Sequence, residues 1–185
     1  MVALSALWLP ILVSAILVFF ASFLLHMVLP FHRSDYGKVP SEDAVMDAVR
    51  PFGIAPGDYM VPNPYSPAGA RTPEFIAKMK KGPAIVMTVM QPGEMRMGGR
   101  LAAWFLFCVI VGVFSGYLTS RALPAGAPYL EVFRFAGTVA FAGYALALWE
   151  NTIWYSRAWT TTLKSTIDGL VYGLLTGGAF GWLWP

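Results

Sequence analysis

Four stretches of this chain are long and apolar enough to cross a lipid bilayer. They run from about Leu4 to Pro30, and over 101–120, 129–149 and 165–184. A helix needs about 20 residues to cross a hydrocarbon core of about 30 Å. Lipid offers no hydrogen-bond partners to the backbone, so each stretch should be a helix. The sequence therefore predicts an all-α integral membrane protein, an up-down bundle of four transmembrane helices.

The composition agrees with a bilayer environment. Of 185 residues, 57% are hydrophobic and only 12% are charged, against about 25% charged in soluble domains. The net charge of +3 is small, so no nucleic-acid partner is expected. The first apolar stretch lacks a preceding positive region and exceeds the usual length in signal peptides, which predicts a permanent helix over 1–30. Cys108 is the single cysteine, which excludes an intrachain disulfide.

Lysine and arginine predict the orientation. Nine lie within 31–100, two more (Arg157 and Lys164) lie between the third and fourth stretches, and only Arg121 and Arg134 lie on the opposite side. The rule weakens for loops longer than about 60 residues, but charges that flank the helices still count. We therefore expect a multi-pass protein of the cell membrane, such as a bacterial inner membrane, with residues 31–100 cytoplasmic and both termini outside.

Residues 31–100 predict a small α+β subdomain between the first two transmembrane helices. Ser41 is typical of a helix N-cap and predicts a helix over 42–50. Thr72 followed by Pro73 predicts a second helix over 73–81. The apolar run from Ala84, with a turn at 91–94, predicts a hairpin over 84–97. A segment of this size is only marginally stable by itself, so we expect contacts with the membrane helices or with a partner to stabilise it.

Glycines recur every fourth position in the last predicted span. Gly169, Gly173, Gly177 and Gly181 share one helix face, and Gly112 and Gly116 form a similar pair in the second span. Small residues at this spacing let helix backbones approach closely in lipid. The glycines could serve packing within one bundle, a homo-oligomer or docking of another membrane subunit, or a pore, and the pattern leaves these readings open.

Ionisable residues lie near the ends of the predicted spans that face residues 31–100. They form a possible polar cluster of His26, Arg100, Glu150 and Asp168. Charged groups at membrane depth are candidates for function. Each also has a structural explanation: Ser165 and Asp168 fit a capping box at the start of the fourth helix, Arg100 and Glu150 can reach the interface, and His26 can be a satisfied interior histidine.

Metal and cofactor sites find little support in the sequence. Met95 and Met97 are weak candidates for copper(I), because thioethers suit that ion, but the expected hairpin does not make enough methionines converge. His26 and His32 are six residues apart, which does not place them on one helix face, so a local two-histidine site is not expected. No cofactor is expected, and no motif for nucleophilic, phosphate-binding or zinc-protease chemistry is present.

These observations favour a small non-enzymatic membrane protein that acts as an accessory or scaffold subunit through its glycine-faced helices. Its partners would be the bilayer and another membrane subunit or a second copy of itself. One alternative is a small transporter or channel that uses His26, Glu150 and Asp168. A second alternative is copper handling through methionines.

Overall fold

The computed structural model describes residues 2–94 and 96–185. The chain divides into two compact units, one comprising Met1–Tyr36 with Arg96–Pro185 and the other Gly37–Met95. The first contains the long helices, and the second corresponds to most of the subdomain expected over 31–100.

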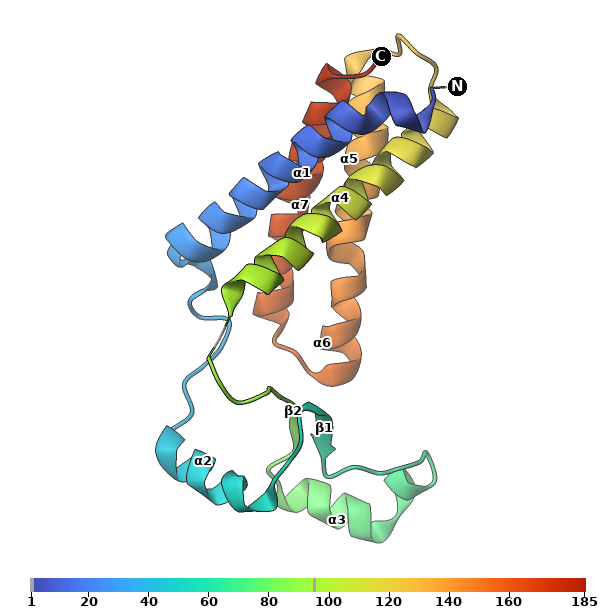
Figure 1. Cartoon of the computed structure of the whole chain (residues 1–185). Coiled ribbons are helices and arrows are strands. Elements are labelled where there is room, and N and C mark those ends of the chain that lie inside the picture. Colours follow the sequence, from blue (N-terminus) through green and yellow to red (C-terminus); the bar gives the residue numbers. More distant parts are fainter. Residues whose placement is uncertain (1, 95) are drawn as a thin grey trace. The chain divides into compact units, whose positions relative to one another are not determined.

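Four long helices build the first unit (Figure 1). Helix α1 covers Trp8–Phe23, between a short 3₁₀ turn at Leu4–Leu7 and a π turn at Leu24–Val28. Helix α4 covers Met97–Ala122 and α5 covers Tyr129–Ala145. A 3₁₀ turn at Leu146–Leu148 joins α5 to the short helix α6, Trp149–Tyr155. Helix α7, Trp159–Trp182, completes the unit.

Three helical segments within the described residues are long and apolar enough to span a membrane: Leu4–Val28, Met97–Ala122 and Tyr129–Tyr155. They match the first three predicted spans in position, with ends that differ by a few residues. Helix α7 covers all but the last two residues of the fourth predicted span, 165–184, but does not meet the same criterion. Its first ten residues carry four threonines, Lys164 and Asp168. Length and composition therefore do not by themselves indicate that α7 spans a membrane, and its contacts with the other long helices have to supply the argument.

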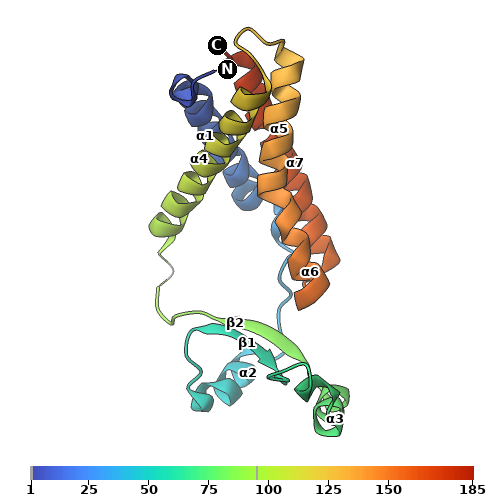
Figure 2. The ribbon, with the colours of Figure 1, turned by 90° about the vertical axis from the view of Figure 1, so that its right-hand side faces the viewer.

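Helix α7 packs along α5, which is the most extensive contact between elements, and α1 packs against both α4 and α7. Figure 2 shows α5 and α7 running side by side. Buried side chains from all four long helices form two core clusters, with Val18 and Tyr172 in one and Leu7 and Phe180 in the other. The two chain ends lie at the same end of this unit (Figure 1), where Gly126 N–H donates to the carbonyl of Pro185 at 2.7 Å.

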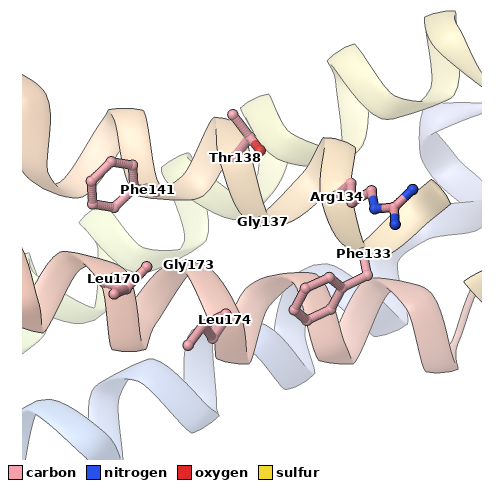
Figure 3. A pocket seen from close by; sticks show the side chains of 8 residues that line it. All are labelled: Phe133, Arg134, Gly137, Thr138, Phe141, Leu170, Gly173 and Leu174. Atoms are coloured by element: carbon pink, nitrogen blue, oxygen red, sulfur yellow. The ribbon is translucent and has the colours of Figure 1, made fainter. Parts of the chain in front are cut away.

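The regular glycines of α7 lie against α5. A methyl group added to Gly177 would come within 2.7 Å of the Phe133 carbonyl oxygen, and one on Gly173 within 2.9 Å of the Gly137 carbonyl oxygen. Figure 3 shows Gly137 and Gly173 facing each other where the helices meet. Gly169 and Gly181 meet Ala145 and Tyr129 of α5 just as closely. The glycine face of α7 is therefore covered by α5 of the same chain.

The second glycine pair also meets neighbouring helices. A methyl group on Gly112 of α4 would lie 3.3 Å from a methyl carbon of Ile11 in α1. One on Gly116 would lie 3.1 Å from the ring of Phe180 in α7. Side chains, which can adjust, form these contacts, so they are less restrictive than the backbone contacts between α5 and α7.

The second unit has two short helices and a two-stranded sheet. Helix α2 covers Glu42–Val49 and α3 covers Pro73–Lys81, close to the predicted ranges. The predicted hairpin over 84–97 is wrong: strand β2, Ile85–Val89, pairs antiparallel with β1, Gly57–Val61. The apolar pattern of β2 fitted a strand, but its partner lies upstream of α3, and Met97 begins helix α4.

Of the two helix caps predicted in this unit, only one forms. Thr72 Oγ1 accepts a hydrogen bond from the Phe75 N–H at 3.3 Å, as expected for an N-cap. Ser41 has a left-handed backbone with φ of 52° and makes no side-chain cap bond. An N-cap residue normally has an extended backbone, which directs its hydroxyl toward the first turn.

Candidate metal centre

The chain reverses direction directly after α1. The π turn at Leu24–Val28 ends with the Leu29 N–H bonded to the Leu24 carbonyl at 2.9 Å. Leu29 is then extended, with φ of −78° and ψ of 144°, because the proline that follows disfavours helical backbone at the preceding residue. A 3₁₀ turn over Pro30–His32 brings the chain back toward the end of α1.

This reversal stacks the two histidines of the chain. The rings of His26 and His32 lie parallel, with centroids 4.1 Å apart and an interplanar angle of 3°. The sequence argument against a local two-histidine site assumed a continuous helix, and it is wrong because the helix ends between the two residues. His26 is half exposed, whereas the side chain of His32 is only 8% exposed.

Asp168 faces both histidines from α7. The helix begins at Trp159, so Asp168 lies inside it and not at its start. The predicted capping box is wrong, and Ser165 Oγ donates instead to the Thr161 carbonyl at 3.0 Å. The Asp168 side chain is 4% exposed. A buried carboxylate in a helix interior needs a cationic or hydrogen-bonding partner.

The donor atoms of these three residues converge. His32 Nε2 lies 2.9 Å from Asp168 Oδ2, and His26 Nε2 lies 3.8 Å from the same oxygen. One ligand atom from each residue can be chosen so that all lie within 4.8 Å of one another. Donors that share a zinc ion at about 2.0–2.2 Å lie about 3–4 Å apart. The spacing of the trio suits a single metal ion.

Two atoms of this cluster are buried without a hydrogen bond. Among the residues that the structure describes, neither His32 Nε2 nor Asp168 Oδ1 has a hydrogen-bond partner. The short approach between His32 Nε2 and Asp168 Oδ2 is an ion-pair distance. Buried polar atoms are normally satisfied, and a cation bound between these two atoms would satisfy both.

The other nitrogen of each ring is held by an acceptor. His32 Nδ1 lies 2.6 Å from Asp35 Oδ2, and His26 Nδ1 lies 3.1 Å from the Ser22 carbonyl. A carbonyl and an ionised carboxylate accept only, so Nδ1 donates in both rings. A metal ion bound between the rings and Asp168 would be ligated by the remaining nitrogen of each ring, Nε2. This arrangement, with a carboxylate or carbonyl behind each ligand, is typical of metal-binding histidines.

Lys164 holds the reversed chain against α7. Its Nζ donates to the Phe31 carbonyl at 2.7 Å, to Ser34 Oγ at 2.8 Å and to Asp35 Oδ1 at 3.0 Å. Burial of Asp35 acts to raise its pKa, but the hydrogen bonds from His32 and Lys164 outweigh burial and lower the pKa below its usual value. Asp35 is therefore ionised at neutral pH and can orient His32. Lys164 and Asp168 are four residues apart, so one face of α7 presents both.

The structure brings together only part of the polar cluster expected from the sequence. His26 and Asp168 meet, while Arg100 on α4 and Glu150 on α6 are exposed and do not belong to the trio. Of the methionine candidates, Met97 is the first residue of α4 and lines an apolar pocket beside His26. Met95 lies outside the described residues.

Sequence reasoning considered His32 and rejected it as a partner of His26, and it gave Asp35 and Lys164 no part in a site. The signal that could have revealed them is Leu29-Pro30, which ends a helix and allows the chain to return. The resulting donor set is two imidazoles and one carboxylate, which suits first-row divalent ions such as Zn²⁺ and Fe²⁺. Comparison with protein-family models, with curated proteins and with solved structures found no match to this chain.

Proposed function

We propose that this protein is a small integral membrane protein that binds one first-row divalent metal ion, of the Zn²⁺ class, through His26, His32 and Asp168. The observation that carries the proposal is the convergence of three donor atoms, two of them on side chains more than nine-tenths buried. The hydrogen bonds behind both histidines fix the ring orientation that ligation needs.

The charge balance supports a divalent ion. Two neutral imidazoles and one carboxylate leave a bound divalent ion with one positive charge. Three protein ligands also leave a coordination position for water or another ligand, as in catalytic zinc sites. The His26 side chain, at 48% exposure, is the most exposed of the three ligands. A further ligand would therefore reach the open coordination position of the metal ion from the side of His26.

The proposal is related to the cation-handling alternative expected from the sequence, with His32 in place of Glu150. The accessory-subunit function that the sequence favoured relied in part on an open glycine face. Because the glycines of α7 meet α5 within the chain, that face lends it no support. The close packing of α7 on α5 and α1 does support α7 as a fourth membrane-spanning helix.

We infer the orientation from the charges that flank the helices. Arg33 and Lys38 follow α1, and Arg96 and Arg100 lie at the start of α4, which favours a cytoplasmic position for this end. The metal centre would then lie at the cytoplasmic end, with both termini outside. A short tag after Pro185 is expected to react with an impermeant reagent added to intact cells. Reaction only after the cells are opened would contradict this orientation.

The direct test is metal binding by the full-length protein in detergent, purified with a tag that contains no histidine. After removal of bound metal by a chelator, titration with Zn²⁺ is expected to saturate at one ion per chain. His26→Ala should weaken binding at least tenfold, because it removes one of the ligands. Glu150→Gln, which changes an exposed carboxylate outside the trio, should bind as the unaltered protein does.

Two outcomes would reject the proposal. One is an unaltered protein that binds no Zn²⁺ although it remains folded and monodisperse. The other is equal Zn²⁺ affinity in His26→Ala and the unaltered protein. Metal analysis of protein purified without added metal would show whether iron or zinc occupies the site in the cell.

A further inference from the structure

An apolar pocket lies directly beside the metal centre, between α1 and α4. Its volume is about 330 Å³. Helix α1 contributes Phe19 and Phe23, the π turn after it contributes His26 and Met27, and α4 contributes Leu101 and Trp104. His26 therefore belongs both to the pocket and to the metal-binding trio.

The polar groups in the wall of this pocket are already paired with each other. Trp104 Nε1 donates to Ser22 Oγ at 2.8 Å, and Ser22 Oγ donates in turn to the Phe19 carbonyl at 2.8 Å. The indole and the hydroxyl are thereby satisfied, and the wall presents hydrocarbon and aromatic surface. The polar exception is the His26 ring, whose Nε2 is directed to the metal centre.

The pocket lies along segments that are apolar enough to cross a bilayer. Its residues from Phe19 on α1 to Met27 in the π turn extend over roughly 12 Å. Phe23 and Met27 are more than half exposed, so the pocket is open at the surface that faces lipid in a bilayer. A hydrocarbon chain can thus enter it without passing through water.

We propose that this pocket binds the alkyl chain of a long-chain carboxylate, a fatty-acid anion, whose carboxylate occupies the free position of the metal ion. This inference rests on the metal site proposed above. The remaining positive charge of the bound ion favours an anionic oxygen donor, and carboxylates are good ligands of Zn²⁺. The volume is near the lower end of the range for small-molecule sites, about 300–1,000 Å³, and suits one chain better than a two-chain phospholipid.

The test measures binding of radiolabelled stearate to the full-length protein in detergent, with and without Zn²⁺. The zinc-loaded protein is expected to bind about one stearate per chain, and removal of Zn²⁺ should weaken binding at least tenfold. Leu101→Trp should weaken stearate binding at least tenfold by filling the pocket, while its Zn²⁺ affinity stays unchanged. Leu106→Trp, on an exposed position of α4 outside the pocket, should bind stearate normally.

Competition identifies the head group. Unlabelled stearate should displace the label, and methyl stearate, which lacks the anionic head, should fail to do so. Equal competition by methyl stearate, stronger competition by phosphatidylglycerol, or unchanged binding in Leu101→Trp would overturn the inference. If Leu101→Trp does not fold, Phe23→Ala removes a pocket wall at an exposed position and serves the same purpose. Saturable Zn²⁺ binding without stearate binding would reject this inference alone, while loss of both would reject the metal site as well.

Discussion

Asp168→Asn is expected to abolish the stabilisation of this protein by Zn²⁺. The substitution keeps the shape of the side chain but removes its charge, and a neutral amide is a poor ligand for Zn²⁺. Binding of a ligand to the folded state alone stabilises it by about 2.7 kcal/mol when the free ligand is at 100 times its Kd. The unaltered protein should therefore show a higher unfolding midpoint with Zn²⁺, and Asp168→Asn should show none of this increase.

The metal-free proteins separate ligation from a simple ion pair. Without metal, the Asp168 carboxylate is buried, with Oδ1 unpartnered among the described residues, and such a group costs folding free energy. Metal-free Asp168→Asn should accordingly be at least as stable as the metal-free unaltered protein. If Asp168→Asn instead lowers the midpoint by the same amount with and without Zn²⁺, the carboxylate serves only as a partner of protonated histidine, and the metal site is disproved. Glu150→Gln is the matched control and should retain the full Zn²⁺ effect.

Gly177→Ala is expected to destabilise the helical unit by about 1–3 kcal/mol, the usual cost of overpacking. The new methyl group would lie 2.7 Å from the Phe133 carbonyl oxygen and 3.1 Å from Gly137 Cα. Both atoms belong to the backbone of α5, so the two helices have to move apart. Unfolding in detergent, followed by circular dichroism, would measure the loss.

The neighbouring glycine provides the control for this prediction. A methyl group on Gly178 would meet only the Tyr129 hydroxyl, at 3.8 Å. Alanine is favoured over glycine within a helix by roughly 0.5–1 kcal/mol, so Gly178→Ala should be neutral or slightly stabilising. Equal effects of the two substitutions would show that helix propensity, and not contact with α5, governs this face.

Patterns that depend on neighbours in the sequence predicted much of the local structure. Helix α3 begins at Pro73 after the Thr72 cap, as expected, because the capping residue and the first turn are adjacent in the chain. The strand over Ile85–Val89 follows from its apolar run, but its partner Gly57–Val61 lies on the other side of α3. Pairing between distant segments leaves no mark in the local pattern of either one.

The start of α7 shows the same limitation. Ser165 and Asp168 have the spacing of a capping box, and a helix that begins there would be a reasonable length for a membrane span. The helix begins instead at Trp159, where its first turns pack through Thr162, which is hydrogen-bonded to Thr152 of α6. Tertiary contact thus placed Asp168 in a helix interior, where its charge needs a partner.

By itself, the sequence determined that this chain carries segments long and apolar enough to cross a bilayer and that its last helix presents a face of glycines. Both properties are set by residue type and period, since burial in lipid and close helix approach depend directly on them. Only the tertiary structure decided that the glycines meet α5 and that His26, His32 and Asp168 meet one another. Two segments bring these residues together: the turn after Leu29, and the face of α7 that carries Lys164 and Asp168. They lie more than a hundred residues apart in the chain.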